Sequence, residues 1–228
     1  FVQLPTSLLA QVDSSVGGKT AIDIPEGKNL VGAFKQPKLV LCDTGALKSL
    51  PHDFLVDGMG EVVKYGMIKS DELFGILMNH DINTVHEVMD DIIARCVAIK
   101  RDVVEADEFD KGERMLLNFG HTLGHSIEQY YHYTGISHGR AVAKGMEIIT
   151  DLAEKRGMCR KGLTADLCGC LKKYELTRDI EPTPAQLGSA CMNDKKRDGS
   201  SIHVIICSDI GKSSAVKMSG ADFNDFLA

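Results

Sequence analysis

The stretch LLNFGHTLGHSIEQYYHYTGISHGRAVAKG, residues 116–145, contains the side chains around which the rest of the chain can be interpreted. His121 and His125 are four residues apart, so a helix would place both on one face. His138 follows in the same stretch, after a short glycine-containing segment. The apolar side chains interspersed with these histidines are spaced to pack against a buried side: Leu123, Ile127, Tyr130 and Tyr131.

Glu61 lies far upstream, in the sequence GMGEVVKYG, and completes a candidate metal site. Imidazole is the commonest protein ligand for zinc, and a catalytic zinc site uses three protein ligands with one position open. A carboxylate with two imidazoles is such a set, so Glu61, His121 and His138 are candidate ligands, with His125 as an additional candidate. The zinc-protease motif HExxH is absent, because Thr122 stands where its glutamate would be. Spacing alone leaves a second interpretation open, in which this is a helix with two ordinary histidines that bind no metal. The other five histidines have no such neighbours and are predicted to be surface or core residues: His52, His80, His86, His132 and His203.

The bulk properties are typical of a globular protein with one large core or two modest ones. The 228 residues are 43% hydrophobic and 25% charged. A net charge of −6 argues against broad nucleic-acid binding, so an anionic ligand would need a local cluster of Lys and Arg. No apolar run reaches the roughly 20 residues that span a bilayer, and we expect no signal peptide. Seven cysteines without a CxxC pair predict reduced thiols in a cytoplasmic protein. Because the chain lacks an initiator methionine, we expect it to be a fragment.

Residues 1–50 carry strand-like and glycine-rich signals typical of a small α/β unit. Gly17-Gly18-Lys19-Thr20 resembles part of a P-loop, but Asp13 stands where that motif requires a glycine. The backbone N–H groups of this turn, with Lys19, could still bind a phosphate; a purely structural turn is the alternative. Lys28 and Asn29, predicted in the following turn, add a cation and an amide. Residues 38–42 (KLVLC) predict a buried strand.

From about residue 50 the pattern becomes mainly helical. Pro51 and Asp53 indicate a helix start, and Glu61 and Lys64 fall on one face of that helix. Apolar residues repeat at helical spacing over 85–104, and residues 139–156 predict a further helix. A strand over 202–207 and a final short helix end the chain. The predicted fold class is α/β followed by mainly α, with a first unit over 1–50 and a second over 51–228.

Six motifs, in order, resemble the 3-dehydroquinate synthase family: QVDSSVGGKTAID, GKNLVGAF, GMGEVVKYG, LLNFGHTLGHSIE, SHGRAVAKGM and NDKKRDG. The resemblance runs through the whole chain. It implies that residues 1–50 are the tail of a Rossmann-like NAD-binding domain and that 51–228 form a helical metal- and substrate-binding domain. Arg140 departs from the family pattern, which commonly has Glu at this position.

The resemblance also implies a site, in which the metal, Zn²⁺ or Co²⁺, is held by Glu61, His121 and His138. The implied NAD contacts are Thr6, Ser7, Lys19, Lys28, Ala46, Leu47, Lys48 and Ser49. The implied substrate contacts are Asp13, Lys19, Asn29, Lys64, Lys100, Arg114, Asn118, His125 and one of Lys195 and Lys196.

The implied reaction is the NAD- and metal-dependent conversion of 3-deoxy-D-arabino-heptulosonate 7-phosphate to 3-dehydroquinate and phosphate, in the shikimate pathway, by a homodimeric enzyme. A substrate with a phosphate and a carboxylate needs several cations, which agrees with the lysines and arginine in the implied site. Three alternatives remain: another sugar-phosphate cyclase of the 2-deoxy-scyllo-inosose synthase type, an iron-group or glycerol dehydrogenase, and a non-catalytic metal-binding helical fragment.

Overall fold

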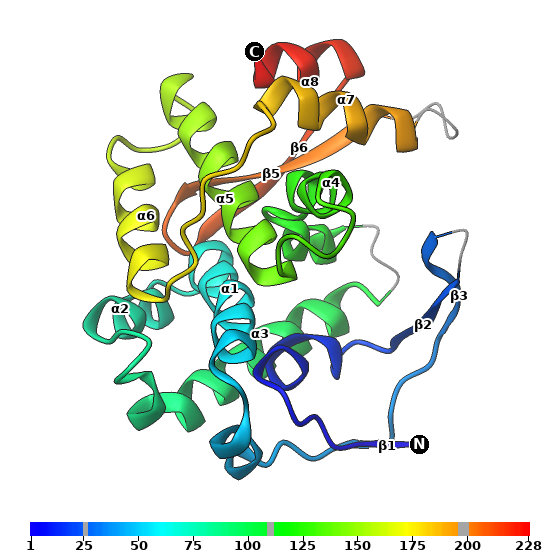
Figure 1. Cartoon of the computed structure of the whole chain (residues 1–228), viewed down its shortest axis with the longest axis vertical. Coiled ribbons are helices and arrows are strands. Elements are labelled where there is room, and N and C mark those ends of the chain that lie inside the picture. Colours follow the sequence, from blue (N-terminus) through cyan, green and yellow to red (C-terminus); the bar gives the residue numbers. More distant parts are fainter. Residues whose placement is uncertain (25–26, 109–111, 196–200) are drawn as a thin grey trace.

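Helix α1 (His52–Lys69) runs through the centre of the molecule and is buried along most of its length (Figure 1). The computed structural model describes residues 1–24, 27–108, 112–195 and 201–228. α1 begins directly after Pro51, whose ring favours the first position of a helix or the one before it. A Cβ added to Gly60 would lie 2.6 Å from the carbonyl oxygen of Gly139, so this glycine permits the close packing of α1 against α5 (His138–Lys155).

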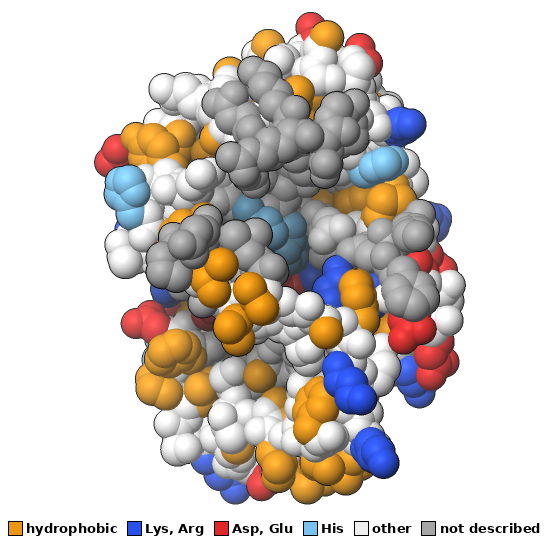
Figure 2. Space-filling model, turned by 90° about the vertical axis from the view of Figure 1, so that its right-hand side faces the viewer, with side chains coloured by type: hydrophobic (Ala, Val, Ile, Leu, Met, Phe, Trp, Pro, Cys, Tyr) orange, Lys and Arg blue, Asp and Glu red, His pale blue; other side chains and the backbone are white. Residues whose placement is uncertain are grey.

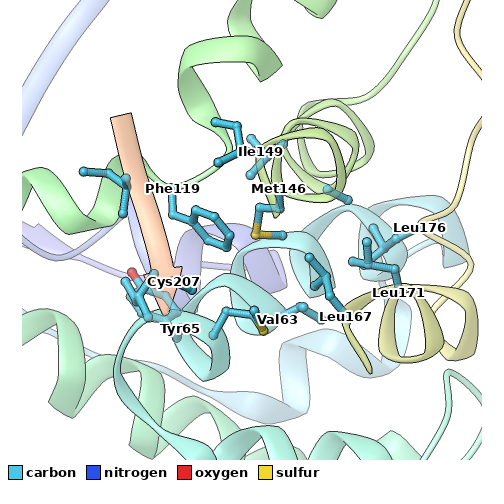
Figure 3. Packing of buried hydrophobic residues seen from close by; sticks show 14 of the residues in the cluster. Val63, Tyr65, Phe119, Met146, Ile149, Leu167, Leu171, Leu176 and Cys207 are labelled. Carbon is cyan, nitrogen blue, oxygen red and sulfur yellow. The ribbon is translucent and has the colours of Figure 1, made fainter. Parts of the chain in front are cut away.

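Five further helices surround this pair: α2 (Asp71–Asn79), α3 (Met89–Ala106) and α6 (Leu163–Lys173) pack on α1, α4 (His121–Tyr130) packs on α5, and α7 (Pro184–Lys195) packs on α4. Figure 3 shows the core between them, with Val63 of α1, Phe119 and Met146 turned toward one another. All three side chains are fully buried. Burial of a side chain of this size stabilises the fold by about 1.5–3 kcal/mol.

The strands form three separate two-stranded sheets within the described residues. β1 (Val2–Gln3) and β4 (Leu39–Val40) are parallel, whereas β2 (Lys19–Ile24) and β3 (Gly27–Phe34) form an antiparallel hairpin. β5 (Ile202–Asp209) and β6 (Lys212–Met218) form a second hairpin, with Ile202 opposite Met218. Helix α8 (Gly220–Leu227) follows, and its first turn is closed by a capping box between Ser219 and Asp222.

The predicted fold class, α/β followed by mainly α, is confirmed. The predicted helix over 139–156 corresponds to α5, the predicted strand over 202–207 to β5, and the final helix to α8. All seven cysteines are free thiols. In the parts of the chain that the structure describes, no helix is both long enough and apolar enough to cross a membrane.

Four local expectations were wrong. The strand over 38–42 is reduced to the two residues of β4, and it is not buried, because Leu39 and Leu41 are 54% and 53% exposed. The backbone of Lys28 and Asn29 lies in strand β3 and not in a turn. The segment over 85–104 starts with a 3₁₀ turn, Val85–Val88, before α3 begins. Tyr130 is 46% exposed instead of packed in the core, because it lies at the C-terminal end of α4.

Candidate active site

Glu61, His121 and His138 meet at one point, although they come from three helices. Glu61 lies in the buried middle of α1 and is 0% exposed, whereas His121 and His138 are the first residues of α4 and α5. Oε1 of Glu61 lies 3.2 Å from Nε2 of His121 and 3.2 Å from Nε2 of His138. Figure 2 shows histidine side chains on the floor of a hollow in this face of the molecule, close to basic side chains.

The geometry of these three residues fits a divalent metal ion. One ligand atom from each lies within 4.8 Å of the others. Two ligands bound to a tetrahedral zinc ion at about 2.0–2.1 Å are separated by about 3.3 Å, which is close to the carboxylate–imidazole distances observed. The set leaves a coordination position open, as catalytic zinc sites require.

The N-terminus of α5 is held against α1 by Asp57, which lies one turn before Glu61. Oδ1 of Asp57 accepts the backbone N–H of Gly139 at 2.5 Å. A Cβ on Gly139 would lie 1.9 Å from the carbonyl oxygen of Asp57, so only glycine allows this approach. The contact places His138, the preceding residue, over Glu61.

The pKa values of the site reflect burial opposed by neighbouring charges. Burial raises the pKa of Glu61, but Lys64 and the two imidazoles outweigh it and hold that pKa well below its usual range. Burial lowers the pKa of His138, but hydrogen bonding to Glu128 and Glu61 raises it to about 10. Glu61 is therefore an anion at neutral pH, as a metal ligand must be.

A second group of charges surrounds Asp13, on the short π-helical turn Ala10–Ser14. Nζ of Lys100 lies 3.0 Å from Oδ1 of Asp13, and Nζ of Lys64 lies 3.6 Å from it. Lys64 also forms an ion pair with Glu61, so it links Asp13 to the three convergent residues. Burial raises the pKa of Asp13, but Lys100 and Lys64 together bring it down to about 2.

Tyr65 also contacts this group, and the sequence analysis did not single it out. Its hydroxyl donates to Oδ1 of Asp13 at 2.7 Å, and its side chain is fully buried. The only sequence feature that pointed to Tyr65 was its position next to Lys64. That position does not distinguish a tyrosine at the site from one that only packs in the core.

Arg114 is 2% exposed, and its guanidinium bonds two backbone carbonyls. It donates to the carbonyl of Gly17 at 2.8 Å and to that of Glu108 at 2.6 Å. Gly17 has a φ of +102°, a conformation that favours glycine. Arg114 thus ties the predicted phosphate-binding turn to the 3₁₀ segment Glu113–Asn118, which ends in the exposed Asn118.

His125 is exposed and lies beside the other two imidazoles, with ring centroids 5.5 Å from His121 and 6.2 Å from His138. With Glu128 and His138 it forms a second group whose ligand atoms lie within 4.8 Å of one another. Glu128 was also missed, although its spacing of seven residues from His121 places it on the same face of α4.

The predicted NAD contacts lie in the N-terminal part of the chain. Thr6 is exposed, and Oγ of Ser7 accepts the backbone N–H of Ala10 at 3.3 Å. Ala46, Leu47, Lys48 and Ser49 form most of the 3₁₀ segment Thr44–Ser49, and the exposed Lys19 begins β2. The side chains of Lys28, Asn29 and Lys195 and the whole of Lys196 lie outside the described residues.

Comparison with known proteins identifies the family. The family model described as 3-dehydroquinate synthase C-terminal matches residues 58–197, and the N-terminal model matches residues 1–57. A 3-dehydroquinate synthase of Clostridium perfringens is 50% identical over 214 residues, covering 93% of this chain and 61% of that protein. One of Clostridium kluyveri is 45% identical over 229 residues, covering 100% of this chain and 64% of that protein. The chain thus spans less than two thirds of the length of these relatives.

Two solved structures show the same fold over this chain. A 2-epi-5-epi-valiolone synthase of Streptomyces hygroscopicus, with NAD⁺ and Zn²⁺ bound, superimposes with a TM-score of 0.87 at 25% identity, covering 100% of this chain and 65% of that one. A 2-deoxy-scyllo-inosose synthase, complexed with carbaglucose-6-phosphate, NAD⁺ and Co²⁺, gives a TM-score of 0.84 at 25% identity, covering 99% of this chain and 66% of that one. Motifs, fold and sequence identity agree, and the chain belongs to the 3-dehydroquinate synthase family.

Proposed function

We propose that this chain supplies the metal- and substrate-binding part of a 3-dehydroquinate synthase. The reaction is the NAD- and metal-dependent conversion of 3-deoxy-D-arabino-heptulosonate 7-phosphate to 3-dehydroquinate and phosphate. The observation that carries the proposal is the convergence of Glu61, His121 and His138 on one point beside a buried cluster of cations. Relatives at 45–50% identity that are 3-dehydroquinate synthases support it.

In this proposal Glu61, His121 and His138 hold a Zn²⁺ or Co²⁺ ion. A bound divalent ion supplies Lewis-acid chemistry, lowering the pKa of a coordinated hydroxyl and polarising a carbonyl. Glu61 contributes the negative charge, and the two imidazoles coordinate through Nε2. Burial of Glu61 at 0% exposure keeps water from competing for its carboxylate.

The cations beside the metal site would bind the acidic substrate. Lys64 and Lys100 are held in place by Asp13, so their ammonium groups are oriented before substrate arrives. Burial lowers the pKa of Lys100, and the neighbouring carboxylate of Asp13 opposes that shift and favours the ammonium form. Arg114 orders the turn at Gly17, and we assign the remaining substrate contacts to Asn29, Asn118, His125, Lys19 and one of Lys195 and Lys196.

NAD would be bound by the N-terminal segment, through Thr6, Ser7, Lys19, Lys28 and residues 46–49. The solved relatives carry NAD⁺ with Zn²⁺ or Co²⁺, which supports both cofactors in this chain. We also propose that the enzyme works as a homodimer in the cytoplasm, where its seven free thiols would remain reduced. Light scattering of the purified protein measures the oligomeric state directly.

A second candidate is a cyclase for a neutral sugar phosphate, favoured by the structural similarity to 2-deoxy-scyllo-inosose synthase. A neutral sugar phosphate has no carboxylate to bind, so it would make use of fewer of the cations in this cluster. The buried Lys64 and Lys100 therefore favour the acidic heptulosonate phosphate. Because the chain belongs to this family, an iron-group or glycerol dehydrogenase is less well supported than either cyclase.

The metal site is tested with His121→Ala and a matched control, His52→Ala, in chain 1–228. His52 is exposed and pairs with Glu175 at 2.9 Å, away from the three convergent residues. Metal analysis after equilibrium dialysis should give one zinc per chain for wild type and the control, and almost none for His121→Ala. Full zinc stoichiometry in His121→Ala would refute the ligand assignment.

The reaction is tested in a chimera that joins residues 1–228 to the preceding part of the Clostridium perfringens relative. With NAD and zinc, it should release inorganic phosphate from the heptulosonate phosphate and not from a hexose 6-phosphate; the reverse preference would establish the second candidate. Chain 1–228 by itself should bind zinc without turnover. Full turnover by this chain with NAD added would contradict that expectation.

A further inference from the structure

Each of the two imidazoles at the metal site has one ring nitrogen directed at Glu61 and the other near a different acceptor. Nε2 of both rings lies 3.2 Å from Oε1 of Glu61. Nδ1 of His121 lies 3.1 Å from the backbone carbonyl oxygen of Phe119. Nδ1 of His138 lies 3.5 Å from Oε2 of Glu128. Both rings therefore direct Nε2 toward Glu61 and Nδ1 toward another acceptor. That acceptor is a backbone carbonyl for His121 and a carboxylate for His138.

We propose that Glu128 is a positioning residue that accepts the Nδ1 proton of His138 and thereby presents Nε2 of that ring to the metal. The inference rests on the proposed metal site and goes beyond its three ligands. Glu128 acts through His138 and does not itself bind the ion.

The chemistry of imidazole gives such a partner a clear role. A neutral histidine carries one ring proton, and it can bind a metal only through the other nitrogen. An acceptor at Nδ1 places the proton there, leaves the lone pair on Nε2, and increases the basicity of that nitrogen. The carbonyl of Phe119 can do this for His121, because the left-handed conformation of Gly120, with φ at +78°, turns the chain between the two residues.

His138 needs a side chain for the same purpose, because it begins α5 after an extended residue. Ser137 has φ −77° and ψ +158°, and the ring nitrogens of His138 face two carboxylates, those of Glu61 and Glu128. Glu128 lies two turns after His121 on α4, so the helix that supplies one ligand also orients the other. Its side chain is 8% exposed, and so this carboxylate keeps little of its hydration.

The test compares Glu128→Gln and Glu128→Ala with wild type in chain 1–228, by zinc competition against a chromophoric chelator. The neutral amide of Gln still offers an oxygen to Nδ1, so affinity should fall about 10-fold; Ala offers none, and the loss should approach about 100-fold. Glu147→Gln is the matched control, because Glu147 lies on α5 and pairs with Lys144. It should leave the zinc affinity unchanged.

Any one of three results would overturn the inference. Unchanged affinity in both Glu128 variants, with thermal unfolding lowered equally in metal-free and zinc-loaded protein, would mean a structural role only. Complete loss of zinc in Glu128→Ala, as in Glu61→Ala, would make Glu128 a ligand, as the second cluster with His125 would allow. Long-range ¹H–¹⁵N spectra of the zinc-loaded wild type should show His138 protonated at Nδ1; a metal-bound Nδ1 would also refute it.

The outcome separates this inference from the metal site itself. If wild type binds no zinc, the proposed function fails. If wild type binds zinc and His121→Ala does not, while both Glu128 variants bind normally, only the positioning role is lost. Far-UV circular dichroism tests whether Glu128→Ala is folded. If Glu128→Ala does not fold, the comparison of Glu128→Gln with wild type tests the inference.

Discussion

At the scale of single residues, three buried cations are each received by a charge or a carbonyl. Lys64, Lys100 and Arg114 are 1%, 6% and 2% exposed, and each bonds or pairs with Asp13, Glu61 or a backbone carbonyl. A buried cation without a partner would lose its hydration with no compensation. The same groups that bind substrate in our proposal are thus also needed to hold the site together.

Arg114→Ala shows how these two roles combine. Two carbonyls, those of Gly17 and Glu108, lose their donor, and hydrogen bonds to a charged group contribute about 1.5–3 kcal/mol each. We expect the free energy of unfolding to fall by about 3–6 kcal/mol in urea titrations, with zinc stoichiometry unchanged. Arg114→Lys should recover only part of the loss, because an ammonium cannot reproduce the planar fork. Loss of zinc in either variant would show that Arg114 acts on the metal ligands.

At the scale of helices, the start of α6 depends on a carboxylate from α5. Oε1 of Glu154 accepts the N–H of Gly162 at 2.5 Å, and Oε2 accepts that of Thr164 at 2.9 Å. Hydrogen bonding to Thr164 and to the Gly162 backbone lowers the pKa of Glu154 from 4.5 to about 2. The free N–H groups at a helix start are satisfied in this way by a neighbouring helix.

The pH dependence of stability follows from that lowered pKa. A carboxyl whose folded pKa lies below its unfolded value stabilises the protein fully above the unfolded pKa, and that contribution is lost as pH falls from about 4.5 toward 2. Glu154→Gln should therefore lower the urea midpoint at pH 7, and the difference from wild type should shrink below pH 4.5. A difference that stays constant down to pH 3 would rule out this carboxylate as its source.

The contact between α1 and α5 depends on the absence of a side chain at Gly139. Gly139→Ala places a Cβ 1.9 Å from the carbonyl oxygen of Asp57, so α5 must move and carry His138 away from Glu61. We expect at least 10-fold weaker zinc binding and a lower melting temperature. Gly75→Ala in α2 is the control, since nothing lies within 4 Å of its added Cβ. It should stabilise the protein by about 0.4–1 kcal/mol with zinc affinity unchanged.

At the scale of the whole molecule, the metal site joins α1, α4 and α5, so an ion bound there should stabilise the entire fold. Free zinc at about 100 times its dissociation constant contributes about 2.7 kcal/mol. For a chain of this size that corresponds to a rise in melting temperature of about 5–10 °C. Calorimetry with zinc and then with excess chelator measures the rise and its reversal. The same rise in His121→Ala would place the ion elsewhere, for instance on the cysteines.

The sequence alone predicted most of the helical architecture and the identity of the convergent residues. Helical spacing predicts α1, α3 and α5 because burial of one face leaves a periodic pattern along the chain. It also places Glu61 with Lys64, and His121 with His125, on common faces. The apolar run over residues 38–42 predicted a buried strand. Leu39 and Leu41 are exposed in the structure, because an apolar run does not show whether another element of the same chain covers it.

Only the tertiary structure decided which faces meet. The distance between Glu61 and His138 depends on the contact of Asp57 with Gly139, which has no local signature because its partners lie 82 residues apart. The same holds for Tyr65 at Asp13 and for Arg114 at Gly17, where the partner is a backbone carbonyl that every residue possesses. Periodicity determines the direction of a side chain on its own element, whereas its partner is determined by how the elements pack together.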